Sequence, residues 1–276
     1  GLWALAGANV YAEFGTMIPK AGGGYVYLRR AYGDFVGFAG GINDFLINIC
    51  AIAYLSINVG EFFAALFPVL AAQEKTVAVV SILLLASLNW LGLREGDATQ
   101  KLTSAIKVLG FSALIFACFA WGGTAAAANP PAERLVTFES HFALFAAVML
   151  SFQVVTEAYA GYFSVVYFAE ENTNPEKNVP RAMFGGILTV IVIYVLLNAA
   201  LLYVLPVAQI AESKTAGADA AGLIFGAGGG TLVTVIAIVA TVSVINALIL
   251  YAPRVPFAMS RDGLLPARIM RVNKGG

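Results

Sequence analysis

The sequence predicts an all-α polytopic membrane protein. Hydrophobic residues occupy 60% of the positions, charged residues occupy 12%, and the mean hydropathy is +0.83, which is far from the balance of a soluble globular domain. The apolar residues fall into separate runs that are long enough to cross a bilayer as helices. Basic residues gather in alternate connections between these runs, as expected for cytoplasmic loops.

Seven apolar segments are expected to cross the membrane as a single transmembrane domain, residues 1–276. The first begins inside an apolar run without the pattern of a signal peptide, so we expect a fragment of a longer protein. The second is long enough to tilt, the loop REGDATQ follows the third, and a linker rich in small residues and proline follows the fourth. The predicted spans are residues 1–18, 37–66, 76–93, 102–121, 142–168, 182–205 and 231–251.

The distribution of positive charge supports this division. One set of connections holds twelve Lys and Arg residues and the opposite set holds three, so the first span starts outside and the C-terminal tail is cytoplasmic. This topology predicts a multi-pass protein of the inner (plasma) membrane. The twelve are Lys20, Arg29, Arg30, Arg94, Lys101, Lys177, Arg181, Arg254, Arg261, Arg268, Arg271 and Lys274, and the three are Lys75, Arg134 and Lys214.

The fifth apolar segment is unusual because Glu157 lies near its midpoint, beside small residues and Gly161. A short carboxylate cannot reach the interface from that depth, and an ionisable group there costs at least a few kcal/mol unless it faces a cavity, a partner or a cargo. We therefore expect a break in the helix from Thr156 to Gly161 that lines a watery site.

Two further polar positions lie inside predicted spans. Lys107 is six residues after Lys101, about 9 Å further along a helix. It either extends back to the cytoplasmic interface along its own stem or acts as a functional amine in the interior. Near the cytoplasmic end of the second span, Asn43 and Asp44 are interpreted as interfacial groups or as hydrogen-bonding groups between helices.

Several functional classes are disfavoured. A net charge of zero gives no basic surface for nucleic acid. Cys50 and Cys118 lack metal-ligand spacing and are expected to be inert thiols. We find no nucleophile with a base in reach, no metal-ligand cluster and no phosphate-binding glycine loop, so we expect neither an enzyme nor a cofactor. A heptahelical receptor would fit seven spans, but it gives no reason for Glu157 beside a helix break.

Four segments, in this order and at these separations, resemble the amino acid permeases of the amino acid–polyamine–organocation (APC) superfamily. The first is similar to the family pattern YAELGTMIP followed by SGGEYVYLREAFG, and the second to the junction of the fourth and fifth helices. The resemblance covers nearly the whole chain. The segments are NVYAEFGTMIPKAGGGYVYLRRAYG (Asn9 to Gly33), NWLGLREGDATQKLTSAIKVLG (Asn89 to Gly110), YFAEENTNPEKNVPRAM (Tyr167 to Met183) and PRVPFAMSRDGLLP (Pro253 to Pro266).

This resemblance implies that the seven spans are helices two to eight of a twelve-helix carrier with the leucine-transporter-type 5+5 inverted repeat. Such carriers bind an amino acid near the midplane, between two broken helices whose free backbone groups hold its carboxylate and amine. One of the two would be present here, so we do not expect the chain to transport by itself. The expected partners are the lipid bilayer, an amino acid substrate, and a proton or counter-substrate in a symporter or antiporter.

Residue by residue, the resemblance places substrate at Thr156, Glu157, Ala158, Tyr159, Ala160 and Gly161. Tyr159 and Gly161 match the family pattern FAYSGW, whereas Glu157 replaces an aromatic residue. Its carboxylate would serve either a cationic substrate or a proton. Polyamine and arginine carriers often have a Glu slightly further on, where this chain has Phe163. A polyamine or other organic-cation carrier of the same superfamily is therefore the alternative.

The resemblance also assigns coupling and gating roles. Lys107 matches the lysine that, in many members, takes the place of a bound sodium ion, with the hydroxyls of Thr241 and Ser243 as its expected neighbours. Pro175 and Pro180 are expected to fix a turn. Charged residues beside them form a candidate cytoplasmic gate of ion pairs, unless they are solvated loop charges worth little each. These residues are Glu170, Glu171, Arg254, Arg261 and Asp262.

Overall fold

The computed structural model describes residues 1–91, 93–128, 140–213 and 215–271, and all secondary structure within them is helical. Arg134, Lys214 and Lys274 lie outside the described residues, as does the side chain of Arg94. The α-helices are α1 (Leu2–Met17), α2 (Gly24–Tyr32), α3 (Asp34–Leu66), α4 (Glu74–Leu91), α5 (Leu93–Ala128), α6 (His141–Ala158), α7 (Pro175–Val204), α8 (Val207–Glu212), α9 (Ala216–Phe225), α10 (Ala227–Tyr251) and α11 (Arg254–Arg261). The 3-10 helices are η1 (Pro68–Leu70), η2 (Tyr162–Glu171) and η3 (Ala267–Met270).

Five helical segments in the described part of the chain are long and apolar enough to cross a membrane. They make this a multi-pass, all-helical membrane protein. The helices α1 and α4 correspond to the predicted first and third spans, and the total of seven spans stays a prediction. The five segments are Asp34–Leu66, Ala98–Gly123, His141–Glu171, Pro175–Val204 and Gly228–Arg261.

The predicted loop REGDATQ is wrong, because its residues belong to α5. Further helices lie between the predicted spans: α2 between the first two, and α8 and α9 between the last two. Pro180 lies inside α7, which already begins at Pro175, so it does not end a turn. The helix α2 forms because it packs closely on α3: a Cβ at Gly40 would lie 2.4 Å from the Leu28 side chain.

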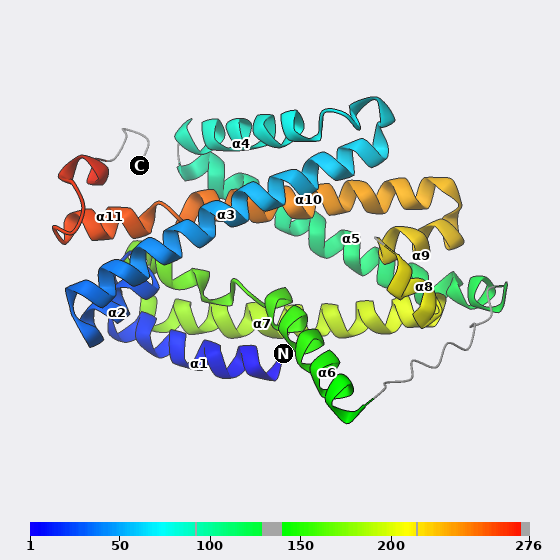
Figure 1. The fold of residues 1–276 in the computed structure, drawn as a ribbon, viewed down its shortest axis with the longest axis horizontal. Helices are drawn as coiled ribbons and strands as arrows, with labels where there is room; N and C mark the ends of the chain where they lie inside the picture. Colours follow the sequence, from blue (N-terminus) through cyan, green and yellow to red (C-terminus); the bar gives the residue numbers. More distant parts are fainter. Residues whose placement is uncertain (92, 129–139, 214, 272–276) are drawn as a thin grey trace.

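The centre of the molecule is α10, which contacts α3, α4, α5 and α9 (Figure 1). Small residues allow these helices to approach one another. A Cβ at Gly60 of α3 would lie 2.4 Å from the backbone carbonyl oxygen of Glu74, and a Cβ at Gly110 of α5 would meet Ile236 of α10 at 3.0 Å. The helices α2 and α11 lie at one end, on the left in Figure 1, and α8 and α9 lie toward the other end.

The helix α6 projects away from the other helices (Figure 1), and none of its residues is buried. In contrast, η2, which follows it, contacts α1, α7 and α10. Val166, Tyr167 and Ala169 of η2 belong to the buried interior. The two halves of the fifth predicted span therefore have different surroundings: η2 packs in the core, and α6 does not.

Replacement of Gly60 by Ala tests the α3–α4 packing. The new methyl group would meet backbone atoms of Glu74, which cannot rotate away, so we expect a loss of about 1–3 kcal/mol of stability. The measurement is the thermal unfolding of the purified full-length protein in detergent. Gly185→Ala on α7 is the matched control, because its Cβ meets no atom within 4 Å. Equal unfolding temperatures for the two variants would contradict the close approach.

Candidate functional site

The helix α6 ends at Ala158, and a three-residue turn separates it from η2. The backbone N–H groups of Tyr159 and Ala160 donate to the carbonyls of Thr156 and Glu157 at 3.1 and 2.9 Å, which tightens the last turn. Gly161 then takes a φ of +99° and a ψ of −9°, a left-handed conformation that glycine adopts at low cost. The α-helical pattern of backbone hydrogen bonds is therefore interrupted here.

A tyrosine of α7 supports this turn. The Tyr194 hydroxyl donates a hydrogen bond of 3.2 Å to the Ala158 carbonyl, an oxygen at the C-terminal end of α6. The rings of Tyr159 and Tyr194 pack edge to face, with centroids 5.3 Å apart. No sequence pattern marks Tyr194 as a site residue, because an aromatic residue inside an apolar run is typical of any membrane helix. The structure identifies it through its contacts.

A cavity of about 290 Å³ lies between the turn and α7. Ala158, Tyr159, Ala160 and Gly161 line one side, and α7 residues that include Tyr194 line the other. The volume is near the lower limit for small-molecule sites. All twelve lining side chains are uncharged, so the hydroxyls of the tyrosines and the backbone groups of the turn supply its polarity.

Two of the six predicted substrate residues do not line this cavity. The Thr156 hydroxyl donates to the carbonyl of Gln153 within its own helix, at 2.8 Å. The Glu157 side chain is on an exposed position of α6, and no ion pair joins it to another described residue. The structure therefore separates Glu157 from the cavity, while the other four predicted residues come together.

The three predicted coupling residues lie on two helices that pack together, α5 and α10. Lys107 is half-buried on α5. Ser243 is fully buried, and its hydroxyl has no hydrogen-bond partner among the described residues. The Thr241 hydroxyl donates to the Ala237 carbonyl at 2.9 Å. Within the described ranges no hydrogen bond joins Lys107 to either hydroxyl, so their joint role stays a prediction.

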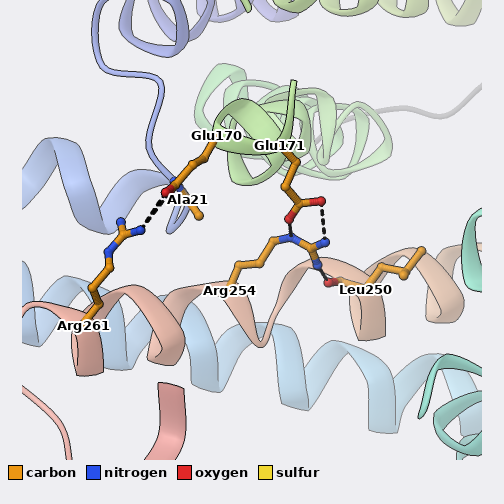
Figure 2. A network of polar contacts seen from close by, with 6 residues as sticks. All are labelled: Ala21, Glu170, Glu171, Leu250, Arg254 and Arg261. Atoms are coloured by element: carbon orange, nitrogen blue, oxygen red, sulfur yellow. Dashed lines mark hydrogen bonds and ion pairs between the residues drawn. The ribbon is translucent and has the colours of Figure 1, made fainter. Parts of the chain in front are cut away.

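The predicted gate residues of η2 form ion pairs with α11 (Figure 2). Glu170 accepts hydrogen bonds from Arg261 Nη1 at 2.8 and 2.9 Å. The same carboxylate accepts a 2.7 Å hydrogen bond from the backbone N–H of Ala21, in the connection between α1 and α2. Glu170 thus joins η2 to two other parts of the chain.

The second ion pair, Glu171 with Arg254, is bidentate. Arg254 Nε and Nη2 donate to the two carboxylate oxygens at 2.7 and 3.0 Å, and Nη1 donates to the carbonyl of Leu250 (Figure 2). The guanidinium also lies over the ring of Phe168, 4.2 Å from its centroid, a favourable cation–π geometry. Only 12% of the Arg254 side chain is exposed, so these contacts are made by a largely buried arginine.

Asp262 pairs with a residue that the sequence did not identify as its partner. Arg29 of α2 contacts Asp262 at 2.6 Å and Asp34 at 2.6 Å. The hydroxyl of Tyr25, a buried residue of α2, donates to Asp262 at 3.0 Å. Burial and this hydrogen bond raise the pKa of Tyr25 to about 12, so its hydroxyl keeps its proton at neutral pH. Every predicted gate residue is therefore in an ion pair, and Arg29 is an additional member of this set.

Comparisons with known proteins point to one family. The family described as amino acid permease matches residues 1–276. The chain is 33% identical over 96% of its length to the serine/threonine exchanger SteT of Bacillus subtilis (strain 168), and 29% identical over 78% of its length to the b(0,+)-type amino acid transporter 1 of Homo sapiens. It covers 59% of the first protein and 44% of the second, so it spans about half the length of these relatives.

The energetic coupling between Glu171 and Arg254 can be measured with a double-mutant cycle of Glu171→Gln and Arg254→Gln. A bidentate pair is stronger than a simple contact, but Glu171 is 46% exposed. Solvent screening should therefore keep the coupling energy near about 1 kcal/mol. The readout is the stability of the full-length protein to thermal unfolding. Arg268→Gln, on an exposed residue, is the control, and a coupling energy of zero would contradict the pairing.

Proposed function

Because the chain belongs to the amino acid permease family, we propose that it is part of a secondary amino acid carrier of the plasma membrane that works by alternating access. The cavity at the turn between α6 and η2 is the observation that supports this proposal most directly. Such a carrier needs a small site reached from either side of the membrane in turn. In this proposal, α6 and η2 are the two halves of one discontinuous span.

The ends of the two helices provide complementary partial charges for an amino acid. The carbonyls at the C-terminal end of α6 are partially negative and suit the substrate's ammonium group. The first N–H groups of η2 precede its first internal hydrogen bond, Ser164 N to Gly161 O at 3.0 Å, and suit the carboxylate. Backbone recognition of this kind holds the part that all amino acids share and leaves the side chain to the cavity.

The cavity favours a small substrate without a charged side chain. Its lining includes no charged residue, and Glu157 is outside it. One relative is named a serine/threonine exchanger, and we propose exchange of neutral amino acids for this carrier as well. The second candidate is a polyamine or other organic-cation carrier. The exposed Glu157 carboxylate, one residue before the end of α6, is the observation that favours it.

Coupling through Lys107 is a subordinate part of the proposal. An ammonium group between α5 and α10 can replace a bound cation electrostatically. The buried Ser243 hydroxyl, which has no partner within the described ranges, would be an acceptor for it. In this role the lysine would bias the carrier between its states without itself touching the substrate.

The ion pairs of η2 are proposed to form the cytoplasmic gate. Glu170 and Glu171 hold the end of η2 to α11, and Asp262 holds the end of α11 to α2 through Arg29. Partly exposed ion pairs contribute little individually, typically about 0–1 kcal/mol. A set of several weak contacts suits a gate that must both close firmly and open repeatedly.

Amino acid exchange by the full-length carrier in proteoliposomes tests the proposed substrate class. Wild type and Glu157→Gln would be loaded with unlabelled amino acid and given labelled L-serine, L-threonine or L-arginine. Because Glu157 lies outside the cavity, we expect neutral exchange to change less than about twofold, within the usual effect of an exposed substitution. Glu13→Gln, on an exposed carboxylate of α1, is the control.

Two outcomes of that experiment would overturn parts of the proposal. Uptake of arginine that collapses in Glu157→Gln alone would make Glu157 the partner of a cationic substrate. Absence of exchange for every amino acid, with wild-type protein present in the vesicles, would contradict the carrier assignment.

Gly161→Ala tests the role of the turn. An alanine at a φ of +99° is strained, at a cost of about 1–3 kcal/mol, although its Cβ would meet no atom within 4 Å. The strain acts on the backbone that faces the cavity, so we expect exchange to fall about tenfold or more, with a smaller effect on expression. Gly222→Ala, a helical position with open space around its Cβ, should keep wild-type exchange. Full activity of Gly161→Ala would argue against the turn as the substrate site.

A further inference from the structure

Asp44 is an ionisable residue inside a membrane-spanning helix to which the proposed mechanism gives no role. It lies on α3, seven residues after Gly37, about 10 Å further along the helix axis. Its Oδ2 accepts a 2.7 Å hydrogen bond from the hydroxyl of Tyr167 on η2. Its Oδ1 accepts a 3.2 Å hydrogen bond from Asn48, one turn further along α3. This carboxylate therefore connects α3 with η2.

The surroundings of Asp44 are buried and neutral. Tyr167 is 2% exposed and Asn48 is 6% exposed. Tyr251 of α10 packs on the ring of Tyr167 at 4.8 Å. Tyr251, Tyr167 and Tyr11 of α1 are the titratable side chains that interact electrostatically with Asp44. In the described part of the chain, none of the groups that interact with this carboxylate is a cation.

Asp44 itself is half-buried. A half-buried carboxylate with no cation partner among the described residues can lower the cost of its charge in two ways. It can be ionised and accept strong hydrogen bonds, or it can bind a proton and become neutral. Tyr167 supplies a charge-assisted hydrogen bond to the ionised form, which is roughly twice as strong as a neutral one. If η2 moved away while Asp44 was ionised, the half-buried charge would lose the hydrogen bond from Tyr167.

We propose that Asp44 is a proton-binding positioning residue that fastens η2 to α3 while it is ionised and releases η2 when it takes up a proton from the cytoplasm. The ionised residue and Tyr167 then hold the cytoplasmic half of the discontinuous span in place. Proton uptake removes the cost of separating them, so release of η2 and protonation of Asp44 are thermodynamically linked. The inference rests on the proposed function, because the turn at the start of η2 is the proposed substrate site.

The position of Tyr167 within η2 explains how this proton would affect both ends of the segment. Tyr167 is five residues after Tyr162, which lines the cavity, and four residues before Glu171, which pairs with Arg254. At the rise of a 3-10 helix these separations are about 10 and 8 Å. Asp44 therefore acts on the middle of a short segment that carries the cavity at one end and the gate at the other.

The first test does not depend on transport. Infrared difference spectra of the full-length protein in lipid, recorded between a low and a high pH, should contain the carbonyl stretching band of a protonated carboxyl group. Other carboxyl groups of the protein contribute to this band, so we expect Asp44→Asn to remove one component of it and Ser56→Ala to retain that component. Ser56 is a matched control, because it is buried on the same helix and, among the described residues, its hydroxyl bonds to the carbonyl of Ile52 alone. A band that persists unchanged in Asp44→Asn overturns the proposal.

The second test is hydrogen exchange of the η2 backbone, corrected for the intrinsic effect of pH on exchange. We expect the protection of residues 162–171 in wild type to fall about tenfold per pH unit as Asp44 is protonated, the limit for a single proton. Tyr167→Phe keeps the carboxyl group and removes its donor, so η2 should be weakly protected at every pH. Protection of η2 that is independent of pH in wild type overturns the proposal.

The third test uses labelled L-serine exchange in proteoliposomes across the same pH range. We expect a pH-dependent rate in wild type and in Ser56→Ala, and a flat profile in Asp44→Asn. If wild type exchanges no amino acid, the proposed function fails, and the infrared and hydrogen-exchange results still decide the role of Asp44. If Asp44→Asn exchanges serine with the wild-type pH profile, the proposal for Asp44 fails and the carrier function stands.

Discussion

A membrane interior contains no water to bond an exposed backbone group, and the proposed substrate site of this protein depends on that constraint. A helix that stops within the bilayer leaves carbonyl and N–H groups that must find other partners. At the end of α6 the partners are two tightened backbone hydrogen bonds and the hydroxyl of Tyr194. The groups that these contacts leave accessible are the ones that we propose to bind the substrate. The interruption is therefore tolerable only where neighbouring helices support it.

This constraint also explains why η2 is attached so extensively. Tyr167 contacts α3, Glu170 contacts α11 and the connection after α1, and Glu171 contacts Arg254. The helix α6, on the other side of the same turn, has no buried residue. The proposed substrate site lies between η2, which is attached to its neighbours, and α6, which has no buried residue. Movement of either segment would change the shape of the site. The polar contacts of η2 determine which of the two moves with less cost.

The sequence predicted the helical membrane class and the family because both depend on local properties. Long apolar runs and the segments around Gly33, Gly110 and Pro253 are visible without knowledge of the fold. The structure ends α6 at Ala158, inside the range Thr156 to Gly161 that the sequence singled out through Glu157 and Gly161, and a break within one membrane span stays a prediction. The sequence did not reveal Tyr194, Tyr167 or Arg29, because their roles depend on partners far away in the chain. It also missed α2, a helix of 9 residues that follows Gly22 and Gly23 and packs on α3.

The winding of η2 has a geometric consequence. Its 10 residues form a 3-10 helix, which rises about 2.0 Å per residue, compared with about 1.5 Å in an α-helix. Rewinding the segment into α-helical form would shorten it by about 5 Å. The difference in length between the two forms of the segment is comparable to the rise of one turn of an α-helix. A change in pitch alone can draw the turn at Gly161 and the carboxylates of Glu170 and Glu171 toward each other.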